Sequence, residues 1–155
     1  MAETNNLFPV FDVPGVVVSE NISTTSGYNP APLWDYVNGD FVLNGAGQPI
    51  YGTGYDAWEL WCIKTIETQR YAHSGYSNNA GVEAEQAFKQ PDRPARESYF
   101  ERTITEALLA DPKGRTIQVK DFIFEWKPDT LTVTCTVIGK AGNTAVISAN
   151  LTTTI

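Results

Sequence analysis

Carboxylates are the side chains of this 155-residue sequence that come nearest to a catalytic set. Glycoside hydrolysis needs two of them, one of which is kept protonated by an apolar pocket. Glu97, Glu101 and Glu106 fall on the polar face of an expected helix, where charged side chains are normally solvated. Peptidoglycan hydrolysis is therefore an alternative to keep, but we expect no catalytic residues. The other available carboxylates are Glu59, Glu67, Asp111 and Glu125.

Metal-based and nucleophilic chemistry lack the necessary residues. His73 is the single histidine, and the two cysteines, Cys62 and Cys135, are 73 positions apart, which fits none of the usual zinc spacings. The sequence also lacks a phosphate-binding G-x-x-x-x-G-K-S/T loop and a G-x-S-x-G nucleophile elbow. We expect no metal and no cofactor, and we expect both cysteines to be buried free thiols.

The charge balance bears on possible partners. The net charge is −7, and the eleven Lys and Arg residues are scattered, so we expect no nucleic-acid partner. No apolar run approaches the roughly 18 residues of a membrane span, and residues 1–6 show no signal-peptide features. We therefore expect a protein made and assembled in the cytoplasm, with no membrane partner.

The first third of the chain divides into an arm and a hairpin. Residues 1–33 contain four prolines and are too apolar for a solvated tail, which predicts an extended arm and connector that packs on a neighbour or on its own domain. Residues 34–155 are expected to form a single domain. Its first element is a β-hairpin over 34–51 that turns at Asn44–Gly47. The arm residues assigned to a protein interface are Leu7, Phe8, Val10 and Phe11.

Helical periodicity follows the hairpin. A first helix is expected to begin near Asp56 as N-cap and to end before Gly75, with an apolar stripe that runs from Trp58 to Gln69. One helical turn is expected at 83–89. A second main helix should begin at Pro94 and stop before Asp111.

Period-2 alternation then predicts strands. Ile117 and Val119 point inward, but the next inward residues are Phe122, Phe124 and Trp126, so a β-bulge is expected near residues 120–121. Strands over 131–137 and from 145 to about 151 complete an antiparallel meander. The predicted class is α+β: an extended arm and hairpin, then two main helices packed on the meander. The expected core comprises Trp58, Trp61, Ile66, Phe100, Ile104, Leu108, Phe124, Trp126 and Val133.

Three segments carry a family resemblance: GDFVLNG at 39–45, GYDAWELWC at 54–62 and RTITEALLADP at 102–112. With them the chain resembles the XkdS-like family of phage tail and contractile-particle baseplate proteins, which is related to the lysozyme-like baseplate wedge, or sheath-initiator, family. The resemblance extends from about Leu7 to about Leu151. It implies a virion structural protein of a phage or phage-tail-like baseplate, present in six copies, with sheath protein, wedge proteins and hub or tube-initiator proteins as partners.

The resemblance also implies one interface element. Asp111-Pro112-Lys113 occupies the position where related wedge proteins carry Glu-Pro-Arg, an element that holds the initiator to the baseplate core. Either Lys113 or Arg115 would make that contact here. The alternative is a plain helix-ending turn with a solvated lysine.

The last strand is the second expected interface. Sheath-initiator-like proteins offer strand edges to the arms of sheath subunits, and residues 144–155 contain many β-branched residues and no charge or proline. Val146 and Ile147 represent this edge, although the segment also fits an ordinary last strand of its own sheet. A small carbohydrate-binding module remains a further alternative, because strands with exposed Trp and Tyr suit sugar stacking. Trp34 and Tyr36 fit either the core or an interface.

Overall fold

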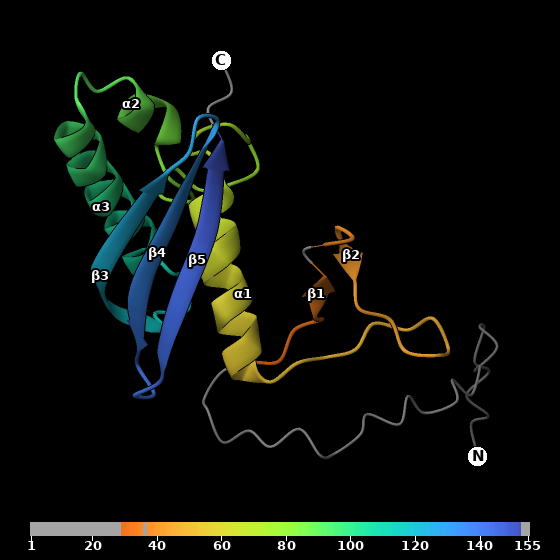
Figure 1. The fold of residues 1–155 in the computed structure, drawn as a ribbon. Coiled ribbons are helices and arrows are strands. Elements are labelled where there is room, and N and C mark those ends of the chain that lie inside the picture. Colours follow the sequence, from red (N-terminus) through yellow and green to blue (C-terminus); the bar gives the residue numbers. More distant parts are fainter. Residues whose placement is uncertain (1–28, 36, 153–155) are drawn as a thin grey trace, which may run out of the picture.

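The computed structural model describes residues 29–35 and 37–152 and has an α+β architecture, as predicted (Figure 1). A small N-terminal hairpin precedes three helices, and three long strands follow. The elements in chain order are β1 (Trp34–Asp35), β2 (Asp40–Phe41), α1 (Gly54–Glu67), α2 (Ala84–Phe88), α3 (Arg93–Leu109), β3 (Thr116–Trp126), β4 (Thr130–Gly139) and β5 (Thr144–Thr152).

The main body has two layers. Strands β3, β4 and β5 form an antiparallel sheet in that order, and α1 and α3 lie side by side against one of its faces (Figure 1). The burial pattern of β4 alternates strictly between half-buried and buried, and that of β5 between exposed and buried, because only one face of each strand contacts the helices. Among the residues that the structure describes, no helix covers the opposite face of the sheet, which we call the open face.

Helix α1 begins two residues before the predicted N-cap. Thr53 is the N-cap, and Asp56 is the third helical residue of a capping box. The Thr53 side chain accepts a hydrogen bond from the Asp56 backbone N–H, and the Asp56 carboxylate accepts the Thr53 backbone N–H at 2.7 Å. The expectation that Asp56 is the N-cap is therefore wrong, although its carboxylate does accept a backbone N–H at the start of the helix.

The end of α1 also differs from the prediction. The helix stops at Glu67, and its C-cap residue, Thr68, is extended. Gln69 forms a parallel bridge with Val82, so it pairs with a strand-like segment and does not continue the helical stripe. Gly81 makes this close pairing possible: its φ is +85°, and a Cβ there would lie 2.5 Å from the Thr68 carbonyl oxygen.

Helix α3 begins and ends close to the predicted positions. Asp92 caps it by accepting the Ala95 N–H at 2.8 Å, and Pro94 lies in its first turn. The predicted helical turn at 83–89 is also present, as α2. The buried face of α3 consists of Phe100, Thr103, Ile104, Ala107 and Leu108.

Strand β3 contains the predicted bulge and a second one. Its register against β4 shifts between Lys120 and Ile123, where Asp121 has a φ of +56°. A second shift lies between Thr116 and Gln118. This shift turns Thr116 inward and leaves Ile117 58% exposed, so the expected inward direction of Ile117 is wrong.

The N-terminal hairpin turns earlier than expected. β1 and β2 pair through Trp34–Phe41, around a turn at 37–39 in which the Asp35 carboxylate accepts the Val37 N–H at 2.8 Å. The predicted Asn44–Gly47 turn exists as well, but it closes a single bridge between Leu43 and Pro49. The turn predicted at Asn44–Gly47 is thus present, but it does not join the two strands of the hairpin, β1 and β2.

The core lies between the two helices and the sheet. Of the nine residues expected there, six are buried: Trp58, Ile66, Phe100, Ile104, Leu108 and Val133. The remaining three, Trp61, Phe124 and Trp126, are half-buried at its margin. Cys62 and Cys135 are buried free thiols, as predicted, and burial raises the pKa of each to about 12.

Candidate functional site

The free edge of β5 is the first candidate site. Within the described residues, β5 pairs with β4 alone. Backbone groups of alternate residues in a strand point to opposite sides. The Thr144 carbonyl accepts the Tyr55 hydroxyl at 3.1 Å, so this group faces α1 and away from β4, and at the other end of the strand Asn150 lines a pocket together with Glu67 of α1. The even-numbered residues between them, Val146 and Ser148, therefore present their N–H and C=O groups at this edge.

The two edges of the sheet differ in regularity. β5 pairs with β4 over nine consecutive residue pairs without a register shift and carries no charged residue. β3 is broken by two register shifts and exposes Lys120, Asp121 and Glu125. Bulges and charges protect edge strands from pairing with other chains. The edge of β5 is thus the one that is suited to accept another strand.

The two residues chosen to represent this edge have opposite environments. Val146 is 66% exposed on the open face of the sheet, whereas Ile147 is fully buried against the helices. Because Ile147 is odd-numbered, its backbone groups point toward Cys135 of β4. Of the two, Val146 is the residue that faces solvent and the free edge.

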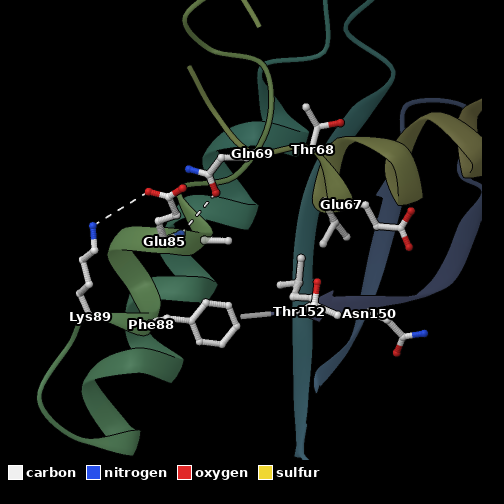
Figure 2. Close-up of a pocket in the computed structure, with 11 residues that line it drawn as sticks. Glu67, Thr68, Gln69, Glu85, Phe88, Lys89, Asn150 and Thr152 are labelled. Carbon is white, nitrogen blue, oxygen red and sulfur yellow. Dashed lines mark hydrogen bonds and ion pairs between the residues drawn. The ribbon is translucent and has the colours of Figure 1, made fainter. Parts of the chain in front are cut away.

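A pocket lies at the Asn150 end of β5. It has a volume of about 550 Å³ and lies between the end of α1, helix α2 and the last residues of β5. Figure 2 shows Phe88 pointing toward Thr152 from one side, with Glu67 and Asn150 together on the other. Partial burial raises the pKa of Glu67, and the Asn150 N–H offsets part of that rise.

The turn after α3 is the second candidate site. Asp111 forms a two-point ion pair with Arg115, from Nε to Oδ2 at 2.7 Å and from Nη2 to Oδ1 at 3.2 Å. Its carboxylate also accepts the backbone N–H groups of Lys113 and Arg115. Burial would raise the pKa of Asp111, but these contacts hold it below its ordinary value. Arg115 also lies over the Trp61 ring, 5.1 Å from its centroid.

This geometry separates the predicted interface residues of the turn. Asp111 and Arg115 are buried and bonded to each other, while Pro112 and Lys113 are exposed. Lys113 forms no ion pair among the described residues, so it is the side chain of this turn that can reach a partner. The predicted arm residues Leu7, Phe8, Val10 and Phe11, and also Tyr36, lie outside the described residues.

Comparison with known families identifies the protein class. The family model of the contractile injection system sheath initiator matches residues 32–142, which is most of the chain. The chain belongs to the sheath-initiator family. The resemblance in the three sequence segments is thereby confirmed. A comparison with curated proteins gave no match.

Family membership makes this protein the sheath initiator of a contractile injection system, a structural baseplate component that interacts with sheath and other baseplate parts. No helix in the described part of the chain is long and apolar enough to cross a membrane. In the same residues, no three His, Cys, Asp or Glu side chains gather as a metal site would require.

Glu97, one of the carboxylates considered for glycoside hydrolysis, serves as a structural partner. Glu97 accepts hydrogen bonds from Arg93 and from the Trp126 indole at 2.8 Å each, and these contacts lower its pKa. A general acid for glycoside hydrolysis needs the opposite shift. The open face of the sheet carries Thr, Ser, Asn, Ile and Val side chains along β4 and β5, so the stacking platform of a sugar-binding module finds no support there.

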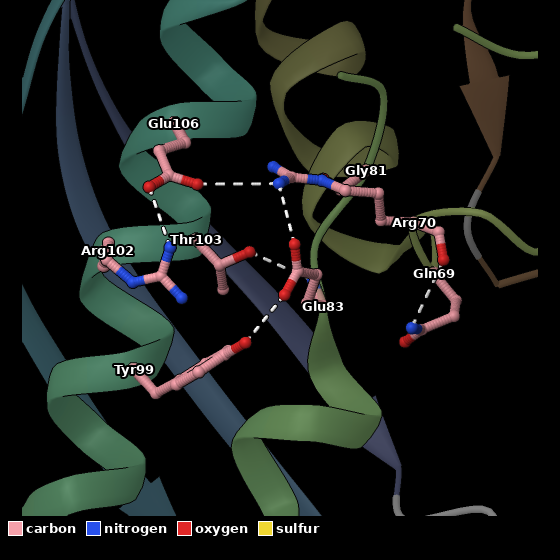
Figure 3. A network of polar contacts seen from close by, with 8 residues as sticks. All are labelled: Gln69, Arg70, Gly81, Glu83, Tyr99, Arg102, Thr103 and Glu106. Carbon is pink, nitrogen blue, oxygen red and sulfur yellow. Dashed lines mark hydrogen bonds and ion pairs between the residues drawn. The ribbon is translucent and has the colours of Figure 1, made fainter. Parts of the chain in front are cut away.

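A polar network anchors the segment that follows α1 (Figure 3). Arg70, 8% exposed, bonds Glu83 at 3.0 Å, Glu106 at 3.5 Å and the Gly81 carbonyl at 3.0 Å. Tyr99 donates to the second oxygen of Glu83 at 2.7 Å. The network joins α3 to the residues that precede α2. Sequence reasoning missed it, because its members are scattered over 37 positions.

Proposed function

We propose that this sheath initiator joins the baseplate to the first sheath ring by main-chain pairing along the free edge of β5. The observation that carries this proposal is the nine-residue β5, regular and uncharged, whose even-numbered backbone groups face away from β4. Strand addition uses these backbone groups for affinity and needs few special side chains. An extended arm of the sheath subunit is the segment that would add there.

The baseplate side of the link belongs to other parts of the chain. Lys113, exposed in a turn fixed by Asp111 and Arg115, is proposed to contact a wedge or hub component. The apolar arm residues Leu7, Phe8, Val10 and Phe11 are proposed to pack on a neighbouring protein. With one copy in each of six wedges, each weak contact would be repeated around a ring, which raises its total strength. Assembly would take place in the host cytoplasm, before the particle is complete.

A pair of proline variants tests strand addition. Val146→Pro removes an N–H that points to the free edge, whereas Ile147→Pro removes one that points to β4. We expect Val146→Pro to fold and to leave tails without attached sheath, as seen by negative-stain electron microscopy. We expect Ile147→Pro to lose folding stability, measured by thermal melting.

Val146→Thr serves as the matched control, since it changes the same exposed side chain and keeps the N–H. It should attach sheath as the unaltered protein does. Normal sheath attachment with a folded Val146→Pro protein would contradict pairing at β5. Deleting residues 1–18 tests the arm separately, and normal baseplates built from the shortened protein would contradict its proposed role.

A further inference from the structure

The free edge of β5 is accompanied by a row of four side chains on α1. Tyr55, Glu59, Ile63 and Glu67 follow one another at intervals of four residues, which places them on one side of the helix. Tyr55 contacts Thr144, and Glu67 and Asn150 line the same pocket, so the two ends of the row lie beside the two ends of the edge. Glu59 lies close enough to Tyr55 to raise the pKa of its hydroxyl, second to the effect of burial.

The lengths of the two elements match. The twelve steps of helix from Tyr55 to Glu67 rise about 18 Å at about 1.5 Å per step. The six steps of strand from Thr144 to Asn150 rise about 20 Å at about 3.3 Å per step. Helix α1 and the edge of β5 therefore run in the same direction, and their two segments have nearly the same length. A strand added to β5 would present every second side chain to α1, and each of these would meet one member of the row.

The row alternates in chemistry. Tyr55 and Ile63 pack partly on the core and present apolar surface, while Glu59 and Glu67 present carboxylates. Neither glutamate forms an ion pair among the described residues, in contrast to Glu83, Glu85, Glu97 and Glu106. A cation opposite each carboxylate would complete the charge balance at this edge.

We propose that the β5 edge and this α1 row form one docking groove, specific for an extended sheath-subunit segment with two basic residues four positions apart. An apolar residue lies midway between the two basic residues, opposite Ile63, and another precedes the first, opposite Tyr55. The basic residue at the Glu67 end also extends its aliphatic stem toward the apolar wall of the pocket formed by Phe88 and Leu151. This inference rests on strand addition at β5 and adds the sequence that the edge selects.

Nine-residue peptides carrying a fluorophore, titrated with the full-length protein by fluorescence anisotropy, test the selection. The matching probe is Thr-Val-Thr-Lys-Thr-Val-Thr-Lys-Thr. In a second peptide the last lysine is moved forward by one position, so that it faces away from α1, and in a third both lysines become glutamates. We expect the first peptide to bind about tenfold more tightly than the second, and binding of the third to be weaker still.

Charge reversal on the protein gives the reciprocal measurement. Glu59→Lys/Glu67→Lys should bind the glutamate peptide more tightly than the lysine peptide. The control is Glu101→Lys/Glu125→Lys, which makes the same charge change at exposed sites away from the row and should keep the original preference. Equal binding of all three peptides to the unaltered protein would overturn the selection, as would identical preferences in the two charge-reversed proteins.

The experiments distinguish selection by the α1 row from strand addition at the β5 edge. If Val146→Pro abolishes binding of every peptide while lysine position has no effect, the β5 edge accepts strands and the row does not select them. If Val146→Pro leaves peptide binding unchanged, pairing at the edge is wrong. Tight binding of the lysine peptide only after deletion of residues 1–18 would show that this chain's own arm occupies the groove, and would also overturn the assignment to the sheath.

Discussion

Asp111 and Arg115 are bonded side chain to side chain across the turn that ends α3, with both side chains less than one-tenth exposed. The pair is four residues apart, and the same carboxylate also accepts two backbone N–H groups of the turn. Asp111 and Arg115 thus act inward and fix the turn, which leaves Lys113, the residue after Pro112, as its outward charge. The Asp111-Pro112-Lys113 motif, which was expected to contact a partner, therefore also stabilises the turn after α3 through its aspartate.

Replacing Asp111 with asparagine should cost about 3 kcal/mol of unfolding free energy, because it leaves the buried Arg115 without its counter-charge. Lys113→Ala removes an exposed charge in the same turn and should change stability by less than about 0.5 kcal/mol. Urea denaturation of both variants measures the difference. Equal stability of the two proteins would show that the ion pair contributes nothing to the fold.

Acid should weaken the protein through Glu83. The Tyr99 hydroxyl and then Arg70 hold the pKa of Glu83 below its ordinary value of 4.5. A depressed folded-state pKa contributes stability that is present above the unfolded-state value and lost as the pH falls through the folded-state value. We therefore expect the unfolding free energy to decrease as the pH is lowered below about 4.5.

Tyr99→Phe separates this effect from general acid denaturation, since it removes the hydrogen bond that lowers the pKa of Glu83 most. The variant should be less stable than the unaltered protein at pH 6, and the gap should narrow toward pH 3. The two stability curves, measured by urea denaturation between pH 3 and pH 6, check this. A gap that stays constant over that range would contradict a role for Glu83 ionisation.

The two tryptophans of α1 should differ in their contributions. Trp58 is fully buried, and its indole N–H donates to Thr116 Oγ1 at 3.1 Å. Trp58→Ala should therefore cost about 3–5 kcal/mol. Trp61 is half-buried beneath the Arg115 guanidinium, so Trp61→Ala should cost about 2 kcal/mol. Thermal melting of the two variants compares them, and a larger loss for Trp61 would invert the assigned helix phase.

The sequence predicted elements where local signals suffice. The 3.6-residue stripe through Phe100, Ile104 and Leu108 and the alternation from Leu131 to Val137 each specify a buried face, and both faces meet in the core. Prediction from the sequence failed where a tertiary contact overrides the local pattern. Gln69 continues the helical stripe in sequence, yet pairing with Val82 draws it out of the helix.

The candidate site shows the same division. The regular, uncharged β5 is visible in the sequence as a segment with several β-branched residues and no proline. Its free edge and the row from Tyr55 to Glu67 are not, because the relation between α1 and β5 spans some 90 residues and depends on packing. The Asp111–Arg115 pair could have been anticipated, since a turn brings acid and base four residues apart together.

The bulge in β3 should tolerate only certain residues. Asp121 has a φ of +56°, a conformation that glycine, asparagine and aspartate adopt readily and β-branched residues do not. Asp121→Val should therefore cost about 2 kcal/mol, whereas Asp121→Gly should be neutral within about 0.5 kcal/mol. Lys120→Val, the same substitution at the exposed neighbouring position, is the control and should also be close to neutral.

Because the bulge keeps the β3 edge irregular, Asp121→Val should also increase self-association at high concentration, measured by light scattering. An Asp121→Val protein as stable and as monomeric as Lys120→Val would show that the bulge does not depend on this residue.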